Sequence, residues 1–139
     1  LRVSLHDAGL HHGRSALRRA AFEAAGFVVR HHLDRAREGA GLVPRRIVAT
    51  GGGVRSSARM QALADATGLP VDVVAVPEGA ALGAAFLARC VAGLESSSTD
   101  ASRWARTAHR IDPDPAWTSA CTERYHRFRH LTEAALRSP

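Results

Sequence analysis

Three consecutive glycines, Gly51–Gly53, join a run of residues suited to a buried strand to a run suited to a helix, in the stretch IVATGGGVRSS. Each glycine costs about 0.5–1 kcal/mol of extra chain entropy relative to alanine. Three residues without side chains at a strand-to-helix junction therefore need a physical explanation. Either the turn cannot form with side chains present, or another molecule must approach the backbone closely.

The elements around this turn follow from the hydrophobic spacing. A helix is expected from Ser15 to about Leu33, with an apolar face of Leu17, Ala20, Ala21, Ala24 and Val28. A strand is expected over Arg45–Thr50, with both faces buried. Ser56 or Ser57 can cap the next helix by accepting from a backbone N–H, and Gly68 ends it.

The second half of the chain continues the alternation. Val71–Val76 is a β-branched run of strand length that Pro77 stops. A helix from about Glu78 to Gly93 is apolar nearly all round, which predicts that it is buried. A polar loop is expected over 94–103, and a C-terminal helix over 115–138.

Alternating helices and strands predict an α/β fold with parallel strands joined by crossover helices. Residues 1–139 are expected to form one domain, because the length is that of a single domain and leaves no room for a cleft between two. Two strands are too few for an isolated sheet covered on both faces. We therefore expect this to be part of a domain, belonging to a longer or divided protein.

The amino-acid composition excludes several classes of enzyme. All 19 basic residues are arginines, so the absence of lysine excludes a P-loop lysine and a Schiff-base lysine. Two widely spaced cysteines, Cys90 and Cys121, no secretory leader and no long apolar run favour a cytoplasmic protein away from membranes. The net charge of +6 leaves nucleic-acid binding open as a minor alternative, because the arginines are dispersed and aromatics are only 5%.

The glycine turn is the main candidate for a site. Unhindered backbone N–H groups at a helix N-terminus suit a phosphate or a nucleotide. The stretch GGGVRS lacks the third glycine of the dinucleotide fingerprint, and a tight turn without ligand is the alternative.

Other polar residues have simpler explanations. The pairs His11–His12 and His31–His32 lack metal-ligand spacing, and Asp112 and Asp114 flank Pro113 in a turn. Asp65 is expected to be solvated. Cys90 is expected in the core, and Tyr125, Phe128 and Leu131 are expected to form a packing stripe rather than a base-stacking surface.

An ordered set of motifs follows the turn: Ser56, Met60–Gln61, Ala64–Asp65, GLPV, Glu78, and LGAA over 82–85. Over nearly the whole chain the sequence resembles the C-terminal domain of the FGGY family of carbohydrate kinases, and its xylulokinase-like members most. The resemblance implies an actin-like, ribonuclease H-like ATPase fold that holds ATP and transfers its terminal phosphoryl group to a sugar hydroxyl with Mg²⁺. It places Gly51, Gly52, Gly53 and Ser56 against ATP, with Arg55 as a weaker candidate.

The resemblance also implies what this stretch lacks. In the family the aspartate base, the sugar-binding residues and the first phosphate-binding loop precede the matched segment, so no catalytic residue and no metal ligand is assigned here. The chain alone is expected to be an incompetent kinase that meets its sugar only through a missing or separately encoded half. The alternatives are a non-catalytic interaction module of the same fold and a basic nucleic-acid-binding domain.

Overall fold

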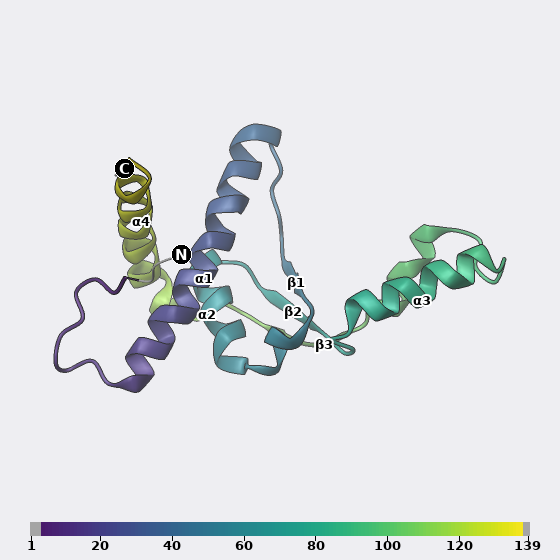
Figure 1. Cartoon of the computed structure of the whole chain (residues 1–139), viewed down its shortest axis with the longest axis horizontal. Coiled ribbons are helices and arrows are strands. Elements are labelled where there is room, and N and C mark those ends of the chain that lie inside the picture. Colours follow the sequence, from purple (N-terminus) through teal and green to yellow (C-terminus); the bar gives the residue numbers. More distant parts are fainter. Residues whose placement is uncertain (1–3, 138–139) are drawn as a thin grey trace.

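The computed structural model describes residues 4–137, so the end of the helix expected over 115–138 lies partly outside the described residues. The elements run α1 (Arg14–Ala40), β1 (Ile47–Ala49), the 3-10 helix η1 (Gly52–Arg55), α2 (Ser57–Thr67) and β2 (Val71–Val74), followed by α3 (Gly79–Val91), the 3-10 helix η2 (Ser98–Trp104), β3 (Thr107–Ile111) and α4 (Pro115–Arg137). The molecule has a body of α1, α2, α4 and the sheet, from which α3 and η2 project (Figure 1).

The sheet has three strands in the order β1-β2-β3. β1 and β2 are parallel, with Val48 opposite Asp72, and α2 forms the crossover between them. β3 pairs antiparallel with β2, with a register irregularity between Val73 and Val74. The expected parallel pair is therefore confirmed. The third strand, β3, was not expected, and it makes the sheet mixed.

α2 lies between the sheet and α1. Met60 and Ala64 pack on Ala49, Val71 and Val73 of the sheet. Toward α1, a Cβ on Gly26 would lie 2.7 Å from the Ala66 Cβ, so the two helices approach closely there. A second cluster joins α1, α2 and α4 through Phe27, Ala66, Cys121 and Tyr125, with Phe128 beside them.

α1 is longer than expected, and it buries a different face. Its buried residues are Glu23, Gly26 and Phe27, whereas the expected apolar face, Leu17, Ala20, Ala21, Ala24 and Val28, is exposed. The apolar spacing was misleading because Glu23 is neutralised by arginines and can therefore be buried. The prediction that β1 is buried on both faces was also wrong, since Val48 is 53% exposed.

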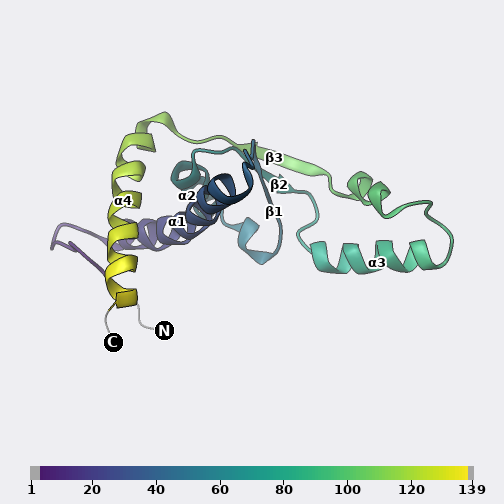
Figure 2. The ribbon, with the colours of Figure 1, turned by 90° about the horizontal axis from the view of Figure 1, so that it is seen from above.

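The prediction that the helix from Glu78 to Gly93 is buried was wrong as well. Phe86 is the one buried residue of α3. Viewed from above, α3 and η2 form an arm that extends from the sheet on the side away from α4 (Figure 2). Within the arm, the rings of Phe86 and Trp104 meet edge-on with centroids 5.4 Å apart. The expected polar loop over 94–103 therefore contains most of a 3-10 helix that packs on α3.

Candidate functional site

The glycine turn begins with a residue that only glycine can occupy comfortably. Gly51 has φ 87° and ψ 177°, a backbone conformation that is nearly exclusive to glycine because other residues have a Cβ. Its N–H donates to the carbonyl oxygen of Pro77 over 2.8 Å. Gly51 is therefore required by the turn itself.

The same carbonyl oxygen of Pro77 ties the start of α3 to the end of β1. It also accepts from the Thr50 hydroxyl at 3.1 Å and from the Gly79 N–H at 2.9 Å. A Cβ on Gly79 would lie 2.7 Å from the Thr50 Oγ1, so the two loops touch. The site is thus a junction of the β1–η1 loop with the β2–α3 loop.

Gly52 and Gly53 differ from Gly51. Neither has a positive φ, and a Cβ on Gly52 would meet no atom within 4 Å. The three atoms nearest to a Cβ on Gly53 would belong to the Arg59 guanidinium, the first of them at 2.7 Å. Nothing in the described chain therefore demands glycine at position 52, and the open space beside it leaves the backbone accessible to a ligand.

Ser56 fixes the start of α2, which decides between the two expected caps. Its hydroxyl oxygen accepts from the Arg59 N–H at 3.3 Å. A hydroxyl that accepts one bond keeps its hydrogen for another acceptor. Ser56 can consequently cap the helix and donate to a ligand at once.

An arginine, a carboxylate and two helix N-termini lie beside the turn. The Arg55 guanidinium lies 3.4 Å from a Glu78 carboxylate oxygen, and both side chains are exposed, so the pair is weak. The N-termini of α2 and α3 follow the two joined loops, and each carries the partial positive charge of a helix dipole. An anionic ligand fits this setting electrostatically.

The residues that the sequence predicted for this site lie in one continuous segment, η1 and its two caps: Gly51, Gly52, Gly53, Arg55 and Ser56. Their role against ATP stays a prediction. Sequence reasoning missed Thr50, Pro77 and Gly79, which hold the two loops together. The sequence offered one signal for them, a proline and a glycine at the boundary between a strand and a helix.

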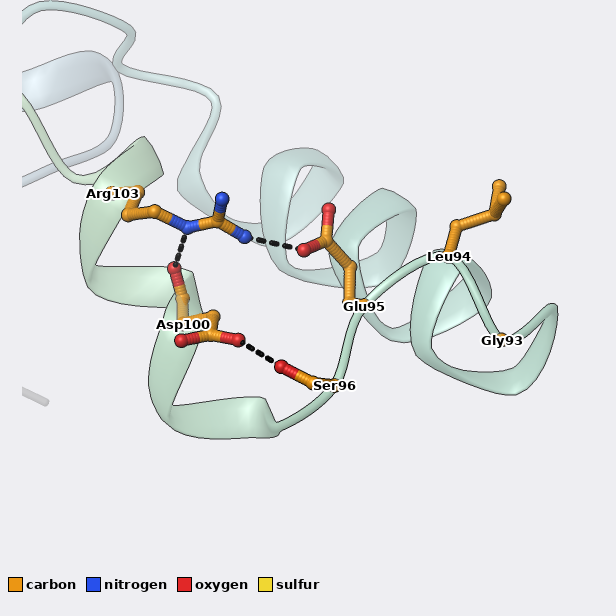
Figure 3. A pocket seen from close by; sticks show the side chains of 6 residues that line it. All are labelled: Gly93, Leu94, Glu95, Ser96, Asp100 and Arg103. Carbon is orange, nitrogen blue, oxygen red and sulfur yellow. Dashed lines mark hydrogen bonds and ion pairs between the residues drawn. The ribbon is translucent and has the colours of Figure 1, made fainter.

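Two hollows lie elsewhere on the molecule. One, of about 430 Å³, lies between α1 and the first turns of α2, and is lined by Ser15, Arg18, Arg19, Phe22, Ala58 and Gln61. The other, of about 470 Å³, lies between the end of α3 and η2 (Figure 3), and is lined by Gly93, Leu94, Glu95, Ser96, Asp100 and Arg103. Neither of them includes the glycine turn, which is open to solvent.

In the hollow of Figure 3, one carboxylate forms ion pairs with two arginines. Glu95 pairs with Arg89 at 2.8 Å and also with Arg103. The hydrogen bond from Arg89, together with Arg103, lowers the pKa of Glu95 below its ordinary value. Glu95 therefore stays charged and ties η2 to α3.

Asp65 is buried, with 3% of its surface exposed, whereas the sequence predicted that it is solvated. Its carboxylate accepts from Arg19 at 2.7 Å, from Gln61 at 2.8 Å and from the Asp114 N–H at 2.8 Å. Asp65 is thus a structural anchor for the start of α4, away from the glycine turn.

Neither cysteine belongs to the glycine turn. Cys90 and Cys121 are both free, and Cys90 is only half-buried rather than in the core. Burial raises the pKa of the Cys121 thiol, and the neighbouring Glu23 carboxylate adds to that effect.

Across residues 4–137, no group of three His, Cys, Asp or Glu side chains gathers to hold a metal ion. Over the same residues, no helix has both the length and the apolarity needed to span a bilayer.

The comparisons with known proteins agree with this architecture. The sequence model of the FGGY family of carbohydrate kinases, C-terminal domain, matches residues 1–92. The probable L-xylulose kinase of Pasteurella multocida is 32% identical over 126 residues, which are 89% of this chain and 25% of that protein. The autoinducer-2 kinase of Escherichia coli K12 is 36% identical over 105 residues, which are 73% of this chain and 20% of that protein.

The chain belongs to the FGGY family of carbohydrate kinases. The crystal structure of xylulose kinase from Rhodospirillum rubrum superimposes on it with a TM-score of 0.77 and 33% identity, covering 93% of this chain and 26% of that one. The chain therefore has the fold of the C-terminal domain of FGGY kinases, which is part of an actin-like ATPase fold. It spans about a quarter of the length of these relatives.

Proposed function

We propose that this chain supplies the ATP-binding side of an FGGY carbohydrate kinase that transfers the terminal phosphoryl group of ATP to a sugar hydroxyl. The observation that carries the proposal is the open backbone at Gly52, in a turn where only Gly51 is required by geometry. The xylulokinase-like relatives favour a ketose such as xylulose as the sugar. Free cysteines support the expectation of a cytoplasmic location.

Each residue of the turn has a separate task in this proposal. Gly52 and Gly53 let ATP contact the backbone, and the N-terminus of α2 favours its negative charge. The Ser56 hydroxyl donates to the nucleotide while it caps α2. Arg55 adds positive charge once it leaves its weak pair with Glu78.

The proposal assigns no Mg²⁺ ligand to this chain, because the described residues hold no cluster of suitable side chains. Phosphoryl transfer depends mainly on positioning and on stabilising charge from several sides. The turn supplies one side of such an arrangement. We therefore expect no appreciable phosphorylation by the 139-residue chain alone.

Calorimetric titration with ATP and with ADP tests the binding site. The variant Gly52→Leu fills the open space without strain, because Gly52 has no positive φ. The matched control is Gly39→Leu, an equally open helical position at the far end of α1. We expect Gly52→Leu to weaken nucleotide binding at least tenfold and Gly39→Leu to leave it unchanged. Equal binding by all three proteins would remove the turn from the site.

An assay with xylulose, ATP and Mg²⁺ tests the second half of the proposal. The expected result is no turnover above a blank without protein. Robust turnover by the isolated chain would contradict the claim that the catalytic machinery lies elsewhere. A folded chain that binds neither ATP nor ADP would instead favour the non-catalytic interaction module.

A further inference from the structure

α4 carries two histidines one helical turn apart on its solvent-facing side. His126 and His130 are separated by four positions, and both side chains are exposed. Residues four apart on a helix place their Cβ atoms about 5–6 Å from each other on one face. The buried residues of α4, Cys121 and Tyr125, lie on the other side of the helix. Both imidazole rings can therefore reach one small ion. We call His126 and His130 the α4 histidine pair.

The two other histidine pairs of the chain lack this arrangement. His11–His12 and His31–His32 are consecutive residues rather than residues one turn apart. In each of them one ring is already engaged, because His12 Nδ1 accepts from a backbone N–H at 2.9 Å and His32 Nδ1 lies 2.8 Å from a backbone carbonyl oxygen. Within residues 4–137, no ring nitrogen of the α4 histidine pair has a hydrogen-bond or ion-pair partner. These nitrogens are available to a ligand.

The charges beside the α4 histidine pair are compensated. Glu123 lies three positions before the pair and Glu133 three positions after it, and both are exposed. The flanking arginines form ion pairs, Arg127 with Asp7 and Arg129 with Glu133. Each arginine beside the pair therefore has a carboxylate partner, which lowers the electrostatic cost of placing a cation there.

The chemistry of the two side chains indicates which ion fits. Imidazole nitrogens suit Zn²⁺, Ni²⁺ and Cu²⁺, whereas Mg²⁺ and Ca²⁺ prefer oxygen ligands. Two histidines at positions i and i+4 also hold the metal in helical zinc motifs, where further ligands complete the site. No third His, Cys, Asp or Glu gathers with the pair in the described chain, so water would fill the remaining positions.

The C-terminal half of α4 has few tertiary contacts to hold it. The cluster that joins α4 to α1 and α2 reaches Phe128. Over residues 129–137, Leu131 is half-buried and the other side chains are exposed. Figure 2 shows this half of α4 extending past α1. A short helical segment without tertiary packing is marginally stable in water. An ion bound across one of its turns would hold the segment in the helical state.

We propose that His126 and His130 bind a divalent transition-metal ion of the Ni²⁺, Cu²⁺ and Zn²⁺ class, and that the bound ion stabilises the C-terminal half of α4. The site lies on a different element from the glycine turn. It takes a different class of metal from the Mg²⁺ that accompanies ATP. The proposal is therefore independent of the proposed function.

Calorimetric titration of the chain with Ni²⁺, in a buffer that does not coordinate metals, tests the site. We expect His126→Ala and His130→Ala each to weaken the tightest Ni²⁺ site at least tenfold. The double variant His31→Ala and His32→Ala should leave this affinity unchanged. Titration with Mg²⁺ should give the same result for the chain and for both single variants, because Mg²⁺ does not select imidazole.

A rearranged variant separates the spacing of the histidines from their number. Arg127→His combined with His130→Arg keeps the composition and makes the two histidines consecutive. It should lose Ni²⁺ affinity as strongly as His130→Ala. Unchanged affinity in the single variants or in the rearranged variant would overturn the proposed site. A tenfold loss in the His31→Ala and His32→Ala variant instead would assign the ion to α1.

Hydrogen exchange measures the effect of the ion on α4. At free Ni²⁺ of about one hundred times Kd, an ion that binds only the helical state suppresses opening about a hundredfold. Amides over 127–134 should then exchange about a hundredfold more slowly, and those of α2 should be unchanged. Equal exchange over 127–134 with and without Ni²⁺ would contradict the claim that the ion stabilises this half of α4.

Discussion

The body and the arm of this molecule differ in how much of their side chains they bury. The body buries three carboxylates, Glu23 and Asp65 at 3% exposed and Asp72 at 4%. The arm exposes Leu87 and Val91 while it buries only Phe86 from α3. Buried charges are tolerated where partners satisfy them. The body is therefore held together partly by buried ion pairs, whereas the arm is held by the contact of α3 with η2 and by the ion pairs of Glu95.

The pairing in the body joins three helices. Glu23 of α1 accepts from Arg19 at 2.7 Å and from Arg124 of α4 at 2.7 and 2.9 Å. Arg19 reaches on to Asp65 of α2 at 2.7 Å. Burial alone would lower the pKa of Arg19 and Arg124, but their hydrogen bonds with Glu23 raise both. No buried side-chain N or O atom among the described residues lacks a hydrogen-bond partner.

Breaking this pairing should give the largest effect on stability. Glu23→Gln keeps the size of the side chain and removes the charge that balances Arg19 and Arg124. Removing one partner of a fully buried ion pair costs about 3–5 kcal/mol. Because the side chains of Arg19 and Arg124 are 24% and 41% exposed and Arg19 keeps Asp65, the free energy of unfolding should fall by about 3 kcal/mol, at the low end of this range. Urea denaturation followed by circular dichroism measures the change, and complete unfolding would be an extreme form of the same result.

Glu133→Gln is the matched control, because Glu133 pairs only with exposed arginines of α4 at 3.8–3.9 Å. It should change the free energy of unfolding by less than about 0.5 kcal/mol. Similar losses in the two variants would show that the buried pairs of the body are no stronger than surface pairs.

A second prediction concerns the same body at high pH. Tyr125 is buried and donates to Asp34 at 2.7 Å, and burial together with this hydrogen bond raises the pKa of Tyr125 to about 12. The native state therefore holds the phenolic proton more tightly than the unfolded state. This stabilisation is complete below pH 10 and is lost as the pH rises through 12.

The loss between these limits should be about 2–3 kcal/mol. Tyr125→Phe removes the titrating group, so its free energy of unfolding should be lower near neutral pH and should change less between pH 10 and 12. Urea midpoints for both proteins across this range give the comparison. Parallel curves for the two proteins would assign the pH dependence to other groups.

Local signals in the sequence predicted much of the body. Ser56 caps α2, and Gly68 ends it with φ 69°, as expected from their positions around an apolar run. The β-branched residues of β1 and β2 predicted both strands, although the strand expected over Val71–Val76 ends at Val74. Of the packing stripe expected on α4, Tyr125 is buried and Phe128 packs beside it, whereas Leu131 lies outside this cluster.

Other features depend on contacts that a single sequence does not display. β3 was missed because TAHRI is mostly polar and exposed, and its pairing with β2 rather than its own pattern makes it a strand. The burial of Asp65 depends on Arg19, which is 46 residues away. The apolar composition of α3 predicted burial, but burial requires a covering surface, and among the described residues the main contact of α3 is with η2.

A third prediction separates two neighbouring glycines of the candidate site. Gly51→Ala forces a Cβ into a conformation with φ 87°, so the free energy of unfolding should fall by about 1–3 kcal/mol. Gly52→Ala meets open space and should change it by less than about 0.5 kcal/mol. Urea denaturation of both variants measures this contrast. Equal losses of stability would mean that the turn needs both glycines for its shape. The absence of a side chain at Gly52 would then be no evidence for a ligand.

The smallest expected effect on stability is that of Leu87→Ser in the arm, which we compare with Phe86→Ser at the adjacent residue. Leu87 is 59% exposed and Phe86 is 2% exposed. Leu87→Ser should leave the exchange of amides in α3 and η2 nearly unchanged, with a free-energy change below about 0.5 kcal/mol. Phe86→Ser removes the contact with Trp104, so amides of the arm should exchange much faster while those of α2 keep their protection. A strong effect of Leu87→Ser in the isolated chain would mean that this face of α3 is covered, and the contrast between a buried Phe86 and an exposed Leu87 would then fail.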